Sequence, residues 1–289
     1  MKNSILDTIG NTPIVKIGSN IFAKLECFNP FGSVKDRAAL QILRDAKENG
    51  LINEGSTVIE ATSGNMGISI AAIGKIMGCK TIIVMPENMS PRRRELISAF
   101  GGEVVLTSEE KGMLGAIEKA ERMAKEIDGA FMPRQFENFS GVWAHYLTTA
   151  PEIEMQMSDQ VDAIVCGIGS GATIMGISNY FYGKNVKIFG VEPLKSPFLS
   201  QGFGGIHRIE GIGAGFCPQI MNINLIDEII AVSDEDALFC ANELCENKGL
   251  FVGISSGAVY YASKQIEKRE EFKDKNIVMI FADSKDRYL

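Results

Sequence analysis

The chain has 289 residues, of which 45% are hydrophobic and 22% are charged, and it contains 30 glycines. This length suits one large domain or two closely packed ones, and the glycine content favours an α/β enzyme with many tight turns. The formal net charge of −7 argues against a nucleic-acid partner, because phosphate recognition needs a basic surface.

Membrane, metal and disulfide sites are also disfavoured. The apolar run 68–77 is interrupted by Lys75 and is too short to cross a bilayer, and the N-terminus lacks the apolar core of a signal peptide. The six cysteines are scattered without a CxxC pair, which predicts reduced thiols and a cytoplasmic location with no membrane partner. With His145 and His207 as the two histidines, we expect no metal site. The arginines of "PRRREL" (91–96) are expected to form a solvated helix face.

Strand-like and helical segments alternate along the chain, which is typical of parallel sheets covered by helices. The first block of segments predicts strands at 56–61, 80–86 and 103–107 and helices at 64–77, 91–100 and 113–125. The second block predicts a helix at 144–157, a strand at 162–168, a helix from about 171 and a strand at 186–192. We expect a boundary near 136–142 and a functional cleft between the blocks.

One lysine stands at the start of a predicted helix. In "FGSVKDRAAL" (31–40), Lys35 precedes a helix whose inward-facing residues would be Ala39, Ile42, Leu43 and Ala46. The ordinary interpretation is a solvent-exposed side chain. However, a cation near the positive end of a helix is disfavoured, so its pKa should fall. A neutral amine there would be a nucleophile able to form a Schiff base.

A glycine-rich turn, "GIGSGAT" (167–173), lies between a predicted strand and a predicted helix. Its backbone N–H groups and the helix dipole could bind an anion, most naturally a phosphate. The same residues also satisfy a dinucleotide-binding pattern through Gly167, Gly169 and Ala172, with Glu192 at the distance of a ribose-binding acid. On this turn alone, an NAD-linked dehydrogenase is an open alternative.

Two further turns concentrate hydroxyl and amide groups. "TSGNMG" (62–67) offers two hydroxyls, a carboxamide and several N–H groups, which would bind a carboxylate, although one of them would suffice for an ordinary helix cap. "GISSGA" (253–258) matches the nucleophile motif of serine hydrolases, centred on Ser255. Both histidines precede Ser255, which is the wrong order for that fold.

Several separate motifs together resemble the cysteine synthase family of pyridoxal phosphate enzymes, and especially the B-type O-acetylserine sulfhydrylases. The similarity runs from "IGNTPIVKI" to the last residues and includes "KLECFNPFGSVKDRAA", "EATSGNMGIS", "GIGSGATIMG", "GIGAGF", "GISSGA" and "DSKDRYL". The resemblance implies fold type II, with pyridoxal 5'-phosphate between two α/β lobes, usually in a homodimer. It implies a smaller, mobile lobe at 37–139, with the substrate-carboxylate loop. It places the phosphate and pyridine-nitrogen sites in a larger lobe made of 1–36 and 140–289.

The resemblance also implies a role for each motif residue. Lys35 would form the internal aldimine and shuttle the α-proton, Asn65 would bond the cofactor's phenolic oxygen, and Ser255 its pyridine nitrogen. The phosphate would be bound by Gly169, Ser170, Gly171, Ala172 and Thr173. The substrate would be bound by Thr62, Ser63, Gly64, Asn65, Met66 and Gln135.

The implied chemistry is β-replacement on an amino acid. A neutral serine at the ring nitrogen makes the cofactor a weaker electron sink, which suits β-elimination to an aminoacrylate followed by addition of a nucleophile. The expected reaction joins O-acetyl-L-serine and sulfide to give L-cysteine. The alternatives are L-cysteine as substrate, releasing hydrogen sulfide and forming lanthionine, cystathionine or serine, and an inactive paralogue that acts as a binding partner.

Two residues depart from the family pattern. Met66 stands where a threonine is usual, which removes a hydroxyl worth on the order of 1 kcal/mol to a bound carboxylate. Phe31 stands where a small residue is usual, and we expect its ring to narrow the pocket beside Lys35. Both changes predict a shift in substrate preference rather than a loss of activity.

Overall fold

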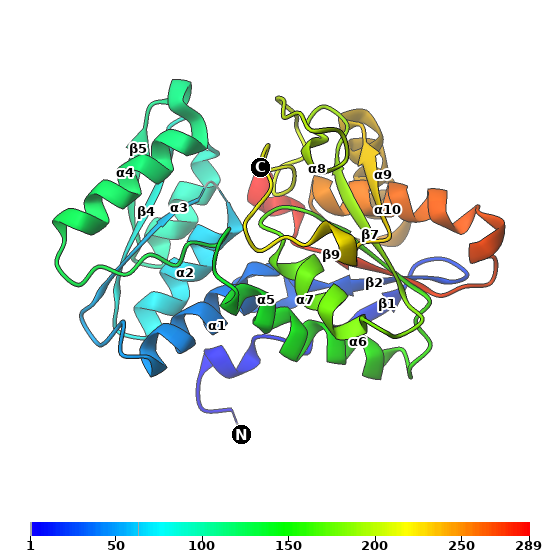
Figure 1. The fold of residues 1–289 in the computed structure, drawn as a ribbon, viewed down its shortest axis with the longest axis horizontal. Helices are drawn as coiled ribbons and strands as arrows, with labels where there is room; N and C mark the ends of the chain where they lie inside the picture. The colour runs from blue at the N-terminus through cyan, green and yellow to red at the C-terminus, as the bar shows by residue number, and fades with distance from the viewer. Residues whose placement is uncertain (1, 63) are drawn as a thin grey trace.

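The computed structural model describes residues 2–62 and 64–289; Ser63, one of the predicted substrate-binding residues, lies outside these ranges. Within them the strands form two sheets, one in the order β1-β2-β9-β6-β7-β8 and one in the order β3-β4-β5. Figure 1 shows the two sheets side by side, each flanked by helices. This is the two-lobed α/β architecture that the sequence predicts.

The larger sheet joins strands from both ends of the chain. Its strands are β1 (Ile14–Lys16), β2 (Ile21–Leu25), β6 (Ala163–Gly167), β7 (Lys187–Pro193), β8 (Glu228–Val232) and β9 (Ile277–Phe281). Only β1 and β2 pair antiparallel in this sheet, and β9 is inserted between β2 and β6. The accompanying helices are α5 (Ser140–Ala144), α6 (Ala150–Gln156), α7 (Ala172–Phe181), α8 (Phe198–Gln201), α9 (Asp234–Lys248) and α10 (Ile254–Glu267).

The smaller sheet is parallel and lies within one continuous part of the chain. Its strands are β3 (Thr57–Ala61), β4 (Lys80–Pro86) and β5 (Glu103–Thr107). Its helices are α1 (Lys35–Glu48), α2 (Asn65–Ile76), α3 (Pro91–Ala99) and α4 (Gly112–Glu126). The predicted limits of the smaller domain, 37–139, stay a prediction.

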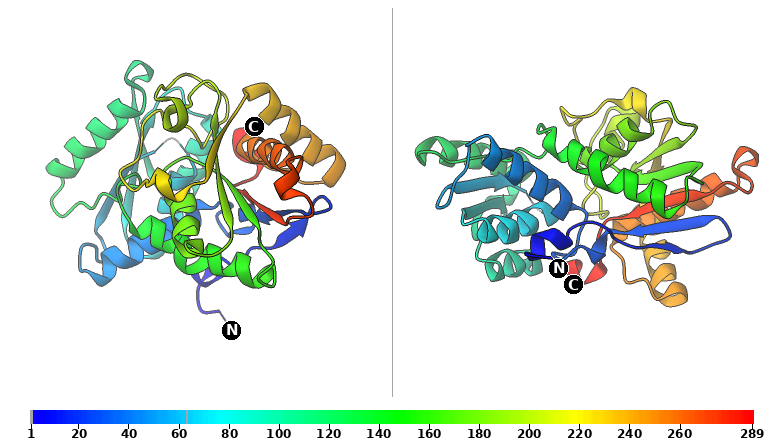
Figure 2. Two further views of the ribbon diagram at one scale, coloured as in Figure 1. Left: turned by 45° about the vertical axis from the view of Figure 1, so that its right-hand side comes forward. Right: turned by 90° about the horizontal axis from the view of Figure 1, so that it is seen from below.

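Strand β9 shows why the larger sheet is apolar on both faces. Successive side chains of a strand point to opposite faces. Met279 and Phe281 pack with α9 and α10, whereas Val278 and Ile280 pack with α6 and α7. Figure 2 shows these two helix layers on opposite sides of the sheet. A strand with helices on both faces has a continuous run of apolar residues in its sequence, as "IVMIF" does.

Most predicted elements are confirmed within one or two residues, including the four inward-facing residues of α1, which are all buried. The helix predicted at 144–157 is different. It begins at Ser140 and contains a π-helical turn at His145–Thr149 before α6. Pro151 lies just after this wider turn within the continuous helix, and it has no N–H to donate to a carbonyl of the preceding turn.

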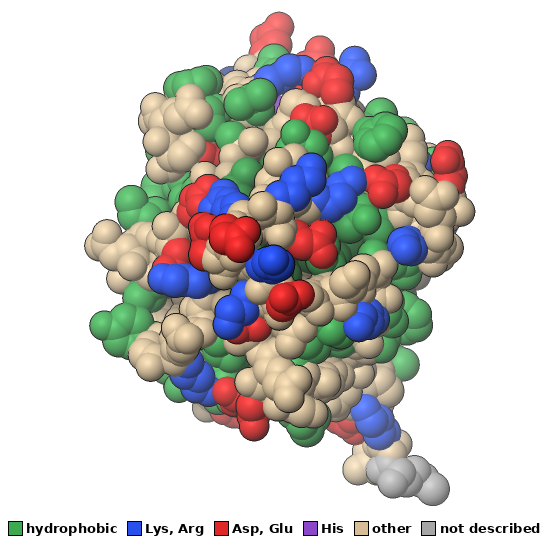
Figure 3. All heavy atoms as spheres, turned by 90° about the vertical axis from the view of Figure 1, so that its right-hand side faces the viewer, with side chains coloured by type: hydrophobic (Ala, Val, Ile, Leu, Met, Phe, Trp, Pro, Cys, Tyr) green, Lys and Arg blue, Asp and Glu red, His purple; other side chains and the backbone are tan. Residues whose placement is uncertain are grey.

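The outer surface carries charges of both signs. Figure 3 shows acidic and basic side chains interspersed over one face of the molecule. In the part of the chain that the structure describes, the helices are too short or too polar for any of them to cross a membrane.

Candidate active site

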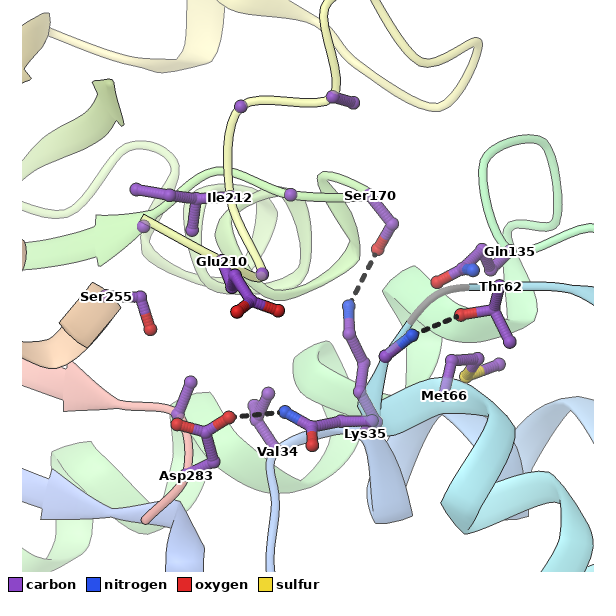
Figure 4. Close-up of a pocket in the computed structure, with 18 of the residues that line it drawn as sticks. Val34, Lys35, Thr62, Met66, Gln135, Ser170, Glu210, Ile212, Ser255 and Asp283 are labelled. Carbon is purple, nitrogen blue, oxygen red and sulfur yellow. Dashed lines mark hydrogen bonds between the residues drawn. The ribbon is translucent and has the colours of Figure 1, made fainter. Parts of the chain in front are cut away.

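A cavity of about 820 Å³ brings the predicted motifs together. It is lined by residues at the starts of four helices, α1, α2, α7 and α10, and by residues that follow β6 and β9. Figure 4 shows Lys35, Ser170, Gln135 and Ser255 around this space. Helix N-termini and the carboxyl ends of parallel strands commonly form ligand sites, because N–H groups converge there.

Nearly all the predicted site residues line this cavity. They are Lys35, Thr62, Gly64, Asn65, Met66, Gln135, Gly169, Ser170, Gly171, Thr173 and Ser255. Ala172 is different, because its side chain packs in the core below the first turn of α7.

Lys35 is the first residue of α1, and its Nζ donates to Ser170 Oγ at 3.1 Å, as the dashed line in Figure 4 marks. Among the described residues it forms no ion pair with a carboxylate. Burial lowers the pKa of Lys35 to about 8, and the charges of Cys166 and Asp283 only partly oppose this effect. The expected fall in pKa is therefore present, and burial is its main cause.

Asp36 connects the helix start that carries Lys35 to the helix start that carries Asn65. Its carboxylate accepts the Phe31 N–H at 2.8 Å and the Ser69 hydroxyl at 2.6 Å. Burial raises the pKa of Asp36 to about 7. Because Ser69 is in the second turn of α2, these bonds fix the spacing between the two helix N-termini.

The ring of Phe31 does not line the cavity. It is buried in the core of the smaller lobe, where it packs edge-on against Phe100 with ring centroids 5.6 Å apart. The prediction that Phe31 narrows the pocket is therefore wrong, since neighbouring helix packing turns the ring away.

The glycine-rich turn before α7 is compact enough to require glycine. A Cβ at Gly169 would lie 2.4 Å from the Gly211 carbonyl oxygen, and Gly171 has a φ of +89°. The first N–H groups of α7 have no acceptor within the helix, so they are suited to an anion. Thr173 Oγ1 lies 3.2 Å from Nε2 of His145, and burial lowers the pKa of this histidine to about 3, which keeps it neutral.

Glu192 is not available to bind a ribose. Its buried carboxylate accepts the N–H groups of Leu199 and Ser200, each at 3.0 Å, at the start of α8. Glu192 therefore does not support the interpretation of the glycine-rich turn as a dinucleotide-binding site.

The opposite wall of the cavity carries the predicted carboxylate site. Thr62 follows β3, and Met66, which is 1% exposed, lines the cavity near it. Gln135 lies in a loop held by Glu60, whose carboxylate accepts the backbone N–H groups of Arg134 and Gln135 at 2.9 and 3.1 Å. Burial raises the pKa of Glu60 to about 7.

Arg93 corrects the expectation of a solvated arginine face. Its side chain is 3% exposed, it pairs with Glu210 at 2.5 Å, and its guanidinium lies 4.9 Å from the centre of the Tyr288 ring. Arg93 and Glu210 both line the cavity. The burial arises because α3 packs against the C-terminal turn, Lys285–Tyr288, a contact that helix periodicity cannot reveal.

Asp283 was also missed as a cavity residue, although its motif was recognised. It is fully buried and lies two residues after the end of β9 at Phe281. A charged residue just past the end of an all-apolar strand is the signal that could have found it, because such positions lie at the functional edge of a parallel sheet.

The fold and the cavity define an α/β enzyme with a lysine amine beside a helix start that is suited to an anion. A family model described as "Pyridoxal-phosphate dependent enzyme" matches residues 5–283. The chain belongs to this family, and its cofactor is pyridoxal phosphate.

Individual relatives extend the family match. Cysteine synthase B of Campylobacter jejuni is 47% identical, covering 99% of this chain and 96% of that protein. A solved cysteine synthase of Entamoeba histolytica superposes with a TM-score of 0.96 at 37% identity, over 100% of this chain and 89% of that one. A solved hydrogen sulfide-producing enzyme of Fusobacterium nucleatum gives a TM-score of 0.96 at 41% identity, over 100% of both chains. The resemblance to cysteine synthases is thus confirmed.

Proposed function

We propose that this enzyme makes L-cysteine and acetate from O-acetyl-L-serine and sulfide. The proposal rests on one observation: Lys35, the glycine-rich turn before α7, Ser255, Thr62 and the start of α2 all line the same cavity. The similarity to proteins named cysteine synthase supports this reaction among those that the family's cofactor allows.

The residues present fit pyridoxal phosphate. The cavity offers an amine for its carbonyl group, a helix start with room for a phosphate, and a buried hydroxyl for its ring nitrogen. In this proposal Lys35 holds the cofactor covalently, Asn65 and Ser255 bind the phenolic oxygen and ring nitrogen, and the phosphate is bound by Gly169, Ser170, Gly171, Ala172 and Thr173. The bound cofactor supplies the electron sink that eases loss of the α-proton and the β-substituent.

Lys35 is also the proposed proton carrier. With a pKa near 8, its Nζ is neutral in a substantial fraction of molecules at mildly alkaline pH, so it can accept the α-proton of the substrate. Ser170 Oγ accepts a hydrogen bond from Nζ at 3.1 Å and orients it. The absence of an ion pair at Lys35 among the described residues leaves the amine able to change protonation state.

The substrate carboxylate is proposed to bind at the turn that opens α2. Thr62 contributes a hydroxyl, Gly64 and Asn65 contribute groups at the helix start, and Gln135 lies beside Thr62. Met66 lines the same wall without a hydroxyl. Because N–H groups at a helix start favour anions, the carboxylate would still be bound there.

A second candidate reaction uses L-cysteine as the substrate and releases hydrogen sulfide. Met66 favours this second reaction, because it replaces the family's usual threonine at a position that lines the cavity where the substrate is proposed to bind. The similarity to the hydrogen sulfide-producing enzyme of Fusobacterium nucleatum supports it as well. The same lysine and serine would serve this reaction, since only the leaving group differs.

The two reactions are separated by following sulfide. Purified enzyme loaded with pyridoxal phosphate is incubated with O-acetyl-L-serine and sulfide, and separately with L-cysteine. We expect sulfide consumption with matching cysteine formation in the first mixture and slow sulfide release in the second. Rapid release from cysteine without consumption in the first mixture would favour the second reaction. The Lys35→Ala variant is the control, and turnover by that variant would contradict the proposed role of Lys35.

We also propose that the enzyme is a homodimer in the cytoplasm. Phe139, Trp143 and Leu147 are more than half exposed and are spaced four residues apart, which makes an apolar stripe suited to a second copy. All six cysteines are free, which fits a reducing compartment. The molar mass of the wild-type protein and of the Trp143→Glu variant, measured by light scattering, tests the dimer. If both proteins have the molar mass of a monomer, the proposal is contradicted.

A further inference from the structure

Two charged residues near the C-terminal end hold Asn65 from both sides. Asn65 Nδ2 donates to Asp283 Oδ2 at 2.5 Å, and Asn65 Oδ1 accepts from Arg287 Nη1 at 2.9 Å. The dashed line at Asp283 in Figure 4 marks the first of these bonds. We propose that Asp283 and Arg287 are positioning residues that fix the carboxamide of Asn65 toward the cofactor. This inference rests on the cofactor-binding role proposed for Asn65.

The chemistry of the partners permits one orientation of the carboxamide. A guanidinium only donates hydrogen bonds, so Arg287 must face the oxygen of Asn65. The amide nitrogen then faces Asp283, which accepts one of its two hydrogens. The second hydrogen stays available for an acceptor in the cavity, such as an ionised phenolic oxygen. A reversed carboxamide would point donor at donor and acceptor at acceptor in a buried site.

Arg287 also reaches the segment before Lys35. Its Nη2 donates to the carbonyl oxygen of Phe31, so one guanidinium contacts both the turn before α1 and the first residue of α2. Gly32 makes this approach possible, because a Cβ there would lie 2.3 Å from Arg287 Nη2. The same glycine has a φ of +82°. A side chain at the glycine of "FGSVK" would therefore displace the Arg287 guanidinium, and the positive φ of the turn favours glycine as well.

Asp283, on the other side of the Asn65 carboxamide, is also held by hydrogen bonds. The Tyr288 hydroxyl donates to Asp283 Oδ2, and the Gly253 N–H donates to the Asp283 carbonyl oxygen at 3.1 Å. A Cβ at Gly253 would lie 2.2 Å from Asp283 Oδ1. Gly253 lies two residues before Ser255. The segment 283–288 thus contacts the chain beside three proposed cofactor residues, Lys35, Asn65 and Ser255.

The experiment separates positioning of Asn65 from a general effect on stability. The variants are Asp283→Ala and Arg287→Met, with Asp283→Asn and Arg287→Lys as conservative partners that keep an acceptor and a donor. Lys285→Met is the matched control, because Lys285 lies in the same turn but bonds Asn242 instead of Asn65. The readouts are the visible spectrum of the loaded enzyme, the dissociation constant for pyridoxal phosphate, and Tm of the cofactor-free protein.

We expect Asp283→Ala and Arg287→Met to weaken cofactor binding by about tenfold and to change the ratio of the visible bands, because the carboxamide can then turn. The conservative variants should recover part of both effects, and Lys285→Met should match wild type. Gly253→Ala provides an independent route, since it keeps Asp283 but displaces its side chain without a strained φ. It should reproduce the spectral change of Asp283→Ala.

The outcomes distinguish the two levels of the proposal. Unchanged spectra and affinities in Asp283→Ala and Arg287→Met, with a normal wild type, would overturn the positioning role alone. A loss of Tm with wild-type band ratios, even in the conservative variants, would also overturn it, because the residues would then act on stability only. A wild-type protein that binds no pyridoxal phosphate would overturn the proposed function as well.

Discussion

Two cations that lie two residues apart at the start of α1 have opposite surroundings. Arg37 donates to Glu26 at 2.7 Å and to Glu152 at 2.6 Å. Burial alone would lower the pKa of Arg37, but the two carboxylates outweigh burial and raise it. Lys35 is partly buried at the cavity wall and contacts a neutral hydroxyl, so desolvation with no carboxylate in contact lowers its pKa to about 8.

The difference shows how one helix turn serves both stability and chemistry. Around Arg37, Lys24 and the two glutamates form a buried network in which every charge has a partner. Such a network is rigid and remains charged. At Lys35 no carboxylate among the described residues contacts the amine. The amine is therefore able to exchange a proton and to attack a carbonyl group.

The largest effect is expected at the reactive cation. Lys35→Ala should lower kcat by about 10⁴-fold or more, because both the nucleophile and the proton carrier are lost. The cofactor-free variant should fold at least as well as wild type, since a partly buried amine without an ion-pair partner has been removed. Steady-state kinetics and a thermal melt measure the two quantities. A large loss of stability would show that Lys35 resembles Arg37 after all.

The paired cation should show the reverse. Arg37→Met leaves Glu26 and Glu152 buried without their guanidinium, which should lower the free energy of unfolding by about 3–5 kcal/mol. Urea denaturation measures this change. The control is Arg269→Met, which removes a partly exposed pair with Glu228 and should cost about 0–1 kcal/mol. Equal effects in the two variants would contradict the distinction.

Acid should weaken the paired region specifically. Burial would raise the pKa of Glu26, but Arg37 and Thr12 lower it to about 2, against an ordinary value of 4.5. The unfolded chain therefore binds the extra proton as pH falls from 4.5 to 2, and about 3 kcal/mol of stability is lost there. Urea unfolding at several pH values should show a shallower decline in Glu26→Gln than in wild type. Identical slopes would contradict the assignment.

The smallest effect is expected at Met66, which lines the same cavity as the reactive lysine. Met66→Thr should lower KM for O-acetyl-L-serine by about fivefold, which corresponds to roughly 1 kcal/mol from one added hydrogen bond. Sulfide release from L-cysteine is measured in parallel, and Tm controls for lost packing of the buried thioether. An unchanged KM would show that the carboxylate does not contact residue 66.

Local patterns predicted much of this structure, and long-range contacts explain what they missed. Strands such as 103–107 and helices such as α1 were predicted because apolar spacing and turn residues are local signals. The short β1, the insertion of β9 between β2 and β6, and the burial of Arg93 depend on residues far apart in sequence. The motifs predicted which residues meet in the cavity, whereas the bonds that hold Asn65 could be found only in the folded chain.

The central place of β9 has a consequence for the order in which the protein folds during synthesis. The hairpin of β1 and β2 is complete at Leu25, but the strand that joins it to the rest of the larger sheet begins only at Ile277. The smaller sheet, made of nearby strands, can close long before. Until β9 is made, β2 of the N-terminal hairpin has one edge without a partner strand. During this interval the nascent chain exposes a strand edge to which chaperones could bind.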